Sequence, residues 1–193
     1  MLLVFFLNSF TKISFLNVKN DDALIFQFSI PVSFQHKKMH IHLIAIGQRM
    51  DTWVSQGYSE YAKRMPSECR LHLIEIVANK RTKNMDVVRA LEEESDRVIS
   101  AIPARALVVA LDVAGKQIST PKLAELMQEW LAGGRDIAIL IGGPDGLSTK
   151  CKSLANMSLS LSNLTFPHPL VRVIIAEQIY RAWTIIKGHP YHR

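Results

Sequence analysis

The last six residues, GHPYHR, bring together side chains that can do chemistry. They supply the aromatic ring of Tyr191, the imidazoles of His189 and His192, and the guanidinium of Arg193. An imidazole titrates near neutral pH and can exchange a proton, and a guanidinium binds carboxylate or phosphate. Chain ends are usually poorly ordered and carry few such groups. The composition of this tail therefore predicts a role in function.

A further imidazole, His168, precedes a long apolar helical segment. Pro167 and Pro169 flank it and restrict its backbone. This position suits either a neighbour of the helix cap or a residue that exchanges protons, and both interpretations stay open. Within the segment, Glu177 and Arg181 are four residues apart in the order that favours an ion pair. Charges on an otherwise apolar helix need partners or a role.

Two other stretches have the composition of ligand-binding loops. In IGGPDGL, Gly142 and Gly143 allow positive φ and a close approach of backbone to ligand, although a simple tight turn is an alternative. In LSNLTF, the apolar Leu161, Leu164 and Phe166 occur with the small Ser162 and Thr165, which predicts a flat apolar slot with exposed amides. Such a slot suits a purine, and an ordinary edge strand is the alternative.

Several common enzyme signatures are missing from the sequence. It has no GxGxxG, no P-loop and no G-x-S-x-G elbow. The alternative interpretation, a flavodoxin-like protein or a small hydrolase, is therefore supported by the α/β pattern alone. His189 and His192 lack a third ligand nearby, so no metal is expected. The two cysteines, Cys69 and Cys151, form no metal-like spacing and are expected to be buried free thiols in a reducing cytoplasm.

The first 38 residues differ in composition from residues 39–193. Seven of the eight phenylalanines precede Met39, whereas all tryptophans and tyrosines follow it. The opening apolar run lacks a basic flank and a cleavage site, and no 18-residue apolar run exists, so neither a signal peptide nor a membrane span is expected. Residues 26–34 alternate like a strand, which Pro31 would confine to an edge. We interpret residues 1–38 as a misassigned start or a loose arm, and residues 39–193 as one domain.

From Met39 onward, strand-like and helix-like patterns alternate. Strands are expected over residues 40–47, 71–77, 106–112 and 136–142, and residues 158–166 are expected to form a fifth strand or a strand-like loop. Helices are expected over residues 51–65, 86–102, 120–131, 150–156 and 169–187, the third with Thr120 as its N-cap. A turn is expected in VAGK, residues 113–116. This alternation predicts an α/β fold with a mostly parallel sheet covered on both faces.

Parallel sheets bind ligands beyond the carboxyl ends of their strands. In this chain the rule selects three segments, residues 111–116, 142–148 and 161–168.

Taken together, LDVAGK, LIGGPDGL, LSLSNLTFPHPLVRVIIAEQIYRAW and HPYHR resemble the RlmH family. The resemblance extends over residues 39–193 and not over residues 1–38. Members are small methyltransferases of the SPOUT superfamily that modify N3 of a pseudouridine in 23S rRNA. The resemblance implies a C-terminal trefoil knot, a homodimer with its site near the interface, and S-adenosylmethionine as cofactor. By match to the family motifs, the cofactor would contact nine residues: Leu111, Gly142, Gly143, Leu161, Ser162, Asn163, Leu164, Thr165 and Phe166.

The resemblance also suggests what the tail does. Methyl transfer from a sulfonium mainly requires that two reactants be positioned, but N3 of pseudouridine must lose a proton. Tyr191 can stack on a base, His192 can accept the proton, and Arg193 can contact phosphate or a developing negative charge. Arg181 and Glu177 would orient the tail or the target base. His168 is an alternative base, and a tail that merely packs at the dimer interface is the alternative to all of these roles.

The expected partner is 23S rRNA in the large subunit or the whole ribosome, in the cytoplasm. The net charge of +6 is modest for a protein that binds free RNA, which favours a shaped target. Candidate RNA contacts are Lys80, Arg81, Lys83, Lys150 and Lys152. A non-catalytic ribosome-binding module of the same fold and a tRNA methyltransferase are alternatives.

We predict that the protein isolated from its native cells begins at Met39. Intact-mass measurement would contradict this interpretation if residues 1–38 were present in it.

Overall fold

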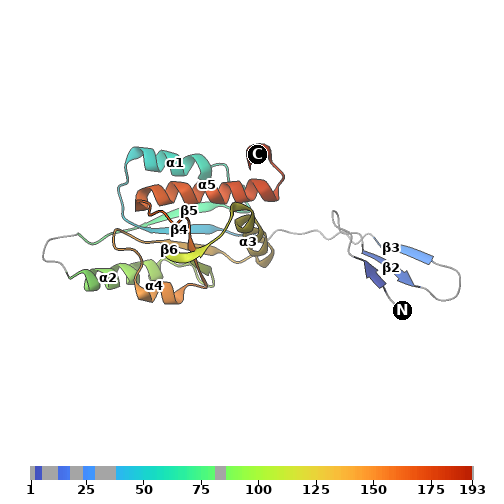
Figure 1. Cartoon of the computed structure of the whole chain (residues 1–193), viewed down its shortest axis with the longest axis horizontal. Helices are drawn as coiled ribbons and strands as arrows, with labels where there is room; N and C mark the ends of the chain where they lie inside the picture. Colours follow the sequence, from blue (N-terminus) through green and yellow to red (C-terminus); the bar gives the residue numbers. More distant parts are fainter. Residues whose placement is uncertain (1–2, 6–12, 18–23, 29–37, 81–85, 193) are drawn as a thin grey trace. The chain divides into compact units, whose positions relative to one another are not determined.

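The computed structural model describes residues 3–5, 13–17, 24–28, 38–80 and 86–192 (Figure 1). Two compact units divide the chain, Met1–Gln35 and His36–Arg193. The first unit contains a three-stranded antiparallel sheet of β1 (Leu3–Phe5), β2 (Ile13–Asn17) and β3 (Leu24–Phe28). The strand expected over residues 26–34 thus begins earlier than predicted, and residues 29–34 lie outside the described part.

The second unit is built on a five-stranded sheet in the order β5-β4-β7-β6-β8, with every neighbouring pair parallel. Its strands are β4 (Ile41–Ile46), β5 (Leu71–Ile76), β6 (Leu107–Gln117), β7 (Ile137–Ile141) and β8 (Met157–Ser160). This arrangement confirms the predicted α/β class with a parallel sheet. The implied trefoil knot stays a prediction.

Helices cover both faces of this sheet. They are α1 (Thr52–Ala62), α2 (Val87–Ser100), α3 (Thr120–Gly133), α4 (Thr149–Leu154) and α5 (His168–Ile186), and the 3-10 helix η1 (Pro190–His192) follows α5. Figure 1 shows α1 and α5 on one face and α2 and α4 on the other. Within the described ranges, no helix is both long and apolar enough to cross a bilayer.

The middle strand of the sheet, β7, is apolar throughout and is buried on both faces, as is typical of parallel sheets. Side chains alternate between two cores because successive residues of a strand point to opposite faces. Leu43 packs in the core that contains Met127 of α3 and Ile179 of α5. Its neighbour Ile44 packs in the opposite core with Val98 of α2. Cys69 and Cys151 are buried free thiols, as the sequence predicts.

The start of α3 differs from the prediction by one residue. Ser119, not Thr120, is the N-cap, and its hydroxyl accepts a hydrogen bond from the amide of Lys122 at 3.3 Å. The hydroxyl of Thr120 instead donates to the side chain of Gln178 on α5, at 2.9 Å. The Thr120 side chain, which local sequence predicts as the N-cap, therefore makes a contact with another helix instead.

Strand β6 contradicts the expected turn in VAGK, because it continues through these residues to Gln117. Both Leu111 and Lys116 pair with Leu159 of β8, so the intervening residues form an irregularity within the strand. A Cβ on Gly115 would lie only 2.5 Å from the backbone carbon of Leu159. Glycine here permits close packing of backbone on backbone, which local sequence cannot distinguish from a turn.

Three imidazoles gather at the amino ends of β4 and β5. His42 and His72 are register partners with ring centroids 5.4 Å apart, and His40 Nδ1 lies 3.3 Å from His72 Nε2. The carboxylate of Asp136 lies 3.5 Å from His42 Nε2. Burial, then His42, His40 and Arg70, lower the pKa of His72 below its ordinary value of 6.5.

This shift predicts that acid destabilises the protein. The folded chain binds a proton on His72 less readily than the unfolded chain does. The contribution of His72 to the free energy of unfolding is therefore fully present above pH 6.5 and is lost as the pH drops below it. The urea midpoint should fall between pH 7 and pH 5, and His72→Gln should reduce this dependence. His189→Gln, which removes an exposed imidazole outside the cluster, serves as the control. Equal pH dependence in the two variants would contradict the prediction.

Candidate functional site

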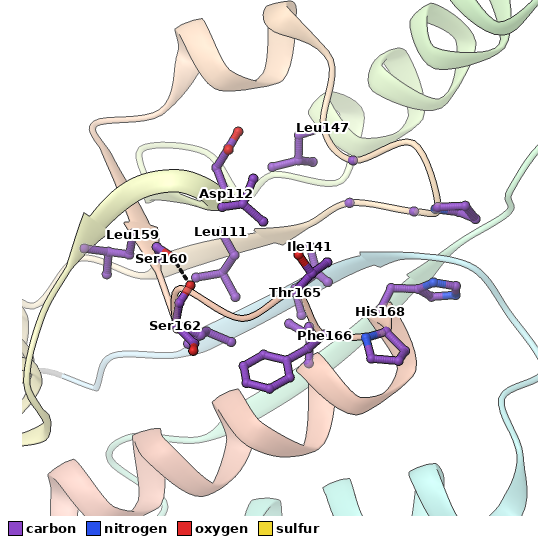
Figure 2. Close-up of a pocket in the computed structure, with 18 of the residues that line it drawn as sticks. Leu111, Asp112, Ile141, Leu147, Leu159, Ser160, Ser162, Thr165, Phe166 and His168 are labelled. Carbon is purple, nitrogen blue, oxygen red and sulfur yellow. Dashed lines mark hydrogen bonds between the residues drawn. The ribbon is translucent and has the colours of Figure 1, made fainter.

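A pocket of about 650 Å³ lies beside the middle of β6 and beyond the carboxyl ends of β7 and β8 (Figure 2). All three segments selected from the sequence contribute to it: Leu111–Val113, Gly142–Leu147 and Leu161–His168, with Asn163 absent from the lining. Further lining residues outside those segments are Ile141, Lys152, Leu159, Ser160 and Val171. The volume falls in the range of small-molecule and cofactor sites.

The loop after β7 shapes the pocket through its glycines. The amide of Gly146 donates to the carbonyl of Gly143 at 3.0 Å, and φ of Gly146 is +78°. A Cβ on Gly142 would lie 2.4 Å from the backbone carbon of Gly146. The two backbone segments therefore approach each other as closely as the atoms allow, and only glycine fits at Gly142.

Hydroxyl groups hold the loop between β8 and α5. The Ser160 hydroxyl donates to the carbonyl of Ser162 at 2.9 Å, which Figure 2 marks. The Ser162 hydroxyl accepts from the amide of Leu164, also at 2.9 Å. Leu164 is 71% exposed, so the loop offers apolar surface beside its own backbone. The flat slot with exposed amides that the composition of LSNLTF predicts stays a prediction.

Asp112 places a carboxylate in the pocket wall. It pairs with Lys152 and accepts from the amide of Ala114 at 2.9 Å. The hydrogen bond from Lys152, then that from Ala114, lower the pKa of Asp112, so it is charged at neutral pH. Lys152 is thereby neutralised by a near neighbour, and Lys150 likewise pairs with Asp96 at 2.6 Å. Lys80, Lys150 and Lys152 stay predicted RNA contacts, and Arg81 and Lys83 lie outside the described residues.

His168 is the first residue of α5 and lines the pocket. In Figure 2 its ring lies at the margin opposite Leu159 and Ser160 and points away from them. Burial, then the charge of Arg172, lower the pKa of His168 below its ordinary value. The imidazole is therefore neutral at neutral pH and able to accept a proton.

Tyr191, Glu177 and Arg181 form a second cluster, which the sequence had grouped only by role. The Tyr191 hydroxyl donates to Glu177 Oε1 at 3.3 Å, and the Arg181 guanidinium lies 5.0 Å from the centroid of the Tyr191 ring. Arg181 Nη2 also pairs with Glu177 Oε1 at 2.6 Å. Burial, a hydrogen bond with Tyr61 and the nearby Glu177 raise the pKa of Tyr191 to about 12. The phenol is therefore neutral, and it packs against α5.

The tail cluster and the pocket are separate within one chain. Neither Tyr191 nor its partners Glu177 and Arg181 line the pocket. Glu177 lies nine residues after His168, about 14 Å along the axis of α5. His192 belongs to η1, and Arg193 lies outside the described residues. Of the four predicted catalytic residues whose side chains the structure describes, His168 borders the pocket, and Glu177, Arg181 and Tyr191 do not.

Arg172, which belongs to no motif singled out in the sequence, is completely buried on α5. Its Nη1 pairs with Glu75 Oε1 of β5 at 2.6 Å, and its Nη2 donates to the carbonyls of Ile46 and Gly47 at 3.0 and 2.8 Å. It thus ties α5 to the carboxyl ends of β4 and β5. The signal in the sequence was an arginine between Val171 and Val173, inside an apolar helix that had to bury it.

Across the described residues, no group of His, Cys, Asp and Glu has the geometry to hold a metal ion.

Comparison with known proteins supports a methyltransferase fold. Residues 39–192 match the family model described as a predicted SPOUT methyltransferase. The chain is 56% identical over 155 residues to ribosomal RNA large subunit methyltransferase H of Methylococcus capsulatus, covering 80% of this chain and 100% of that protein. The protein of the same name from Thioalkalivibrio sulfidiphilus is also 56% identical, with 80% and 99% covered.

Among solved structures, tRNA (m1G37) methyltransferase from Aquifex aeolicus is 14% identical, with a TM-score of 0.47 over 74% of this chain and 69% of that one. On the match to the family model and to these relatives, the chain belongs to the SPOUT methyltransferases and, within them, to the RlmH family. This excludes the flavodoxin-like and hydrolase alternatives.

The glycine loop gives a direct test of the pocket geometry. Gly142→Ala should destabilise the protein by about 1–3 kcal/mol, because the new Cβ would overlap the backbone of Gly146. Chemical denaturation measures this change.

Gly133→Ala is the matched control, because a Cβ on Gly133, the last residue of α3, would meet no atom within 4 Å. It should leave the stability unchanged or slightly increased. Equal effects of the two substitutions would show that the loop at Gly142 is not packed as described.

Proposed function

We propose that this protein transfers a methyl group from S-adenosylmethionine to N3 of a pseudouridine in 23S rRNA, acting on assembled ribosomes in the cytoplasm as a homodimer. The observation that carries the proposal is the convergence on one pocket of a segment of β6 and of the loops that follow β7 and β8. The relatives named ribosomal RNA large subunit methyltransferase H support rRNA as the substrate. The choice of pseudouridine N3 rests on the family resemblance of the sequence motifs.

The residues present fit S-adenosylmethionine. Leu111, Leu161 and Phe166 offer apolar surface to an adenine ring, and the backbone of the glycine loop can approach the ligand closely because Gly142 has no Cβ. When bound, S-adenosylmethionine supplies a methyl group already activated on a sulfonium.

The chain then has two tasks, which are to position the acceptor and to manage its proton. Holding the acceptor nitrogen close to the methyl group lowers the barrier because the encounter becomes intramolecular. His168 borders the pocket and is neutral, so it can accept the proton that the nitrogen loses. His192 of the tail is the other candidate for this role.

The separation of tail and pocket supports a site completed by a second copy. In one chain Tyr191 is held by Glu177 and Arg181, away from the pocket. A neighbouring subunit can bring its own tail to that pocket, as a symmetric dimer would do twice. Two protomers would then form two sites, each with the pocket of one chain and the tail of the other.

Methylation of ribosomes tests the activity directly. The Met39–Arg193 protein, labelled S-adenosylmethionine and ribosomes from cells lacking the enzyme should yield one labelled methyl group on a 23S pseudouridine, located by mass spectrometry. His168→Asn should bind S-adenosylmethionine and lose about 10²–10⁴ in rate. Binding without labelling of any RNA would favour the non-catalytic module, and labelling of tRNA instead would favour a tRNA methyltransferase.

Subunit mixing tests whether the tail acts on the partner's pocket. Gly142→Ala, defective in the pocket, and Tyr191→Ala, defective in the tail, should each be inactive alone. After subunit exchange, mixed dimers would contain one intact site, so about a quarter of the wild-type activity should return. Tyr191→Phe, which keeps the ring, is the control for stacking. No recovery on mixing would place tail and pocket of one chain in one site.

A further inference from the structure

A second pocket of about 450 Å³ adjoins the first, and the two share Pro144 and His168 in their walls. Its remaining walls are the loop after β4, Gly47–Met50, and the segment after β5, Val77–Asn79. Both pockets therefore open at the carboxyl edge of the same sheet, on either side of one imidazole. An acceptor placed in the second pocket would face a methyl donor placed in the first.

The loop Gly47–Met50 is fixed in an unusual backbone conformation. Gly47 has φ +106° and Arg49, which is not a glycine, has φ +56°. Arg172 Nη2 donates to the Gly47 carbonyl at 2.8 Å. A Cβ added to Gly47 would lie 3.2 Å from this Nη2 atom. Such strain persists only where the surroundings hold it, and here the buried guanidinium does so. The pocket wall is therefore preorganised.

Arg49 is exposed at the rim of this pocket. Within the described ranges, no hydrogen bond or ion pair joins its guanidinium to another residue. The basic residues near the first pocket differ, because Lys150 and Lys152 are both paired with carboxylates. An unpaired guanidinium on a rigid loop is suited to a phosphate, which it can bind through two hydrogen bonds.

The inner surface of the second pocket suits a base rather than another anion. Met50 and Val77 give it apolar surface, and Val77 is 54% exposed. Asn79 lines the pocket without offering its side chain to a ligand, because that side chain is hydrogen-bonded to the Ala90 carbonyl at 3.2 Å and to Arg97 at 2.7 Å. An apolar surface beside a cationic rim matches a nucleotide extruded from RNA.

We propose that this second pocket receives the nucleotide that is methylated, with its base against Met50 and Val77 and its phosphate on Arg49. The inference rests on the proposed function and identifies the acceptor side of the same site. His168 then lies between donor and acceptor, where a neutral imidazole can accept the proton that the acceptor nitrogen loses. Arg172 acts as a positioning residue, because it holds the loop that carries Arg49.

The test compares Arg49→Asn with Arg105→Asn in methylation of ribosomes over a range of salt concentrations. Arg105 is the matched control because it is also exposed, also has positive φ (+64°), and lies just before β6 at the opposite edge of the sheet. Asparagine tolerates positive φ at both positions. Each substitution therefore removes one charge and little else.

We expect Arg49→Asn to raise the KM for ribosomes about tenfold and to lower the slope of log KM against log salt by about one, with S-adenosylmethionine affinity unchanged. Arg49→Lys should retain most of the salt slope. Arg105→Asn should match the wild type. If the wild type methylates ribosomes and the two asparagine variants behave alike, this inference is wrong and the proposed function stands. If the wild type methylates no RNA, both are wrong.

Discussion

The buried guanidinium of Arg172 is the interaction on which both pockets depend. A charge taken out of water is costly unless it is paired and hydrogen-bonded. Here Glu75 pairs with it from β5, and the carbonyls of Ile46 and Gly47 accept from it at the end of β4. One side chain thus fixes the N-terminal part of α5 against two strand ends. His168, four residues earlier, and the loop that begins at Gly47 take their places from this contact.

The same contact also has an electrostatic consequence. The charge of Arg172 adds to burial in lowering the pKa of His168, so the imidazole between the pockets is kept neutral. A neutral imidazole is suited to accept a proton, whereas a protonated one would repel a cationic methyl donor. Structure and chemistry are therefore linked through one arginine, which neither contacts the solvent nor lines either pocket.

The parts of the fold that local patterns determine could be predicted from the sequence. Alternation and helical periodicity located the five strands and five helices of the second unit, and the rule on strand ends selected the loops of the first pocket. Parts set by distant contacts could not be predicted. Local sequence predicts a turn at Gly115, whereas in the structure this glycine lets β6 pack against the backbone of Leu159. Thr120 reads as a cap until Gln178 is opposite its hydroxyl.

The tail shows the same limit in a functional residue. Its side-chain types pointed to chemistry, but only the structure shows that Tyr191 is held on α5 by Glu177 and Arg181, apart from the pocket of its chain. Arg172 was missed for the opposite reason, because a single arginine in an apolar helix has no local pattern. Its partners come from strand ends about a hundred residues away in the sequence, Glu75 among them.

The most direct test of this account is a crystal structure of the protein with S-adenosylmethionine bound. The account predicts that the ligand fills the pocket lined by Leu111, Gly142 and Leu161, with its methyl group directed past His168 and Pro144 toward the second pocket. A methyl group directed away from His168, or a ligand bound elsewhere on the chain, would contradict it.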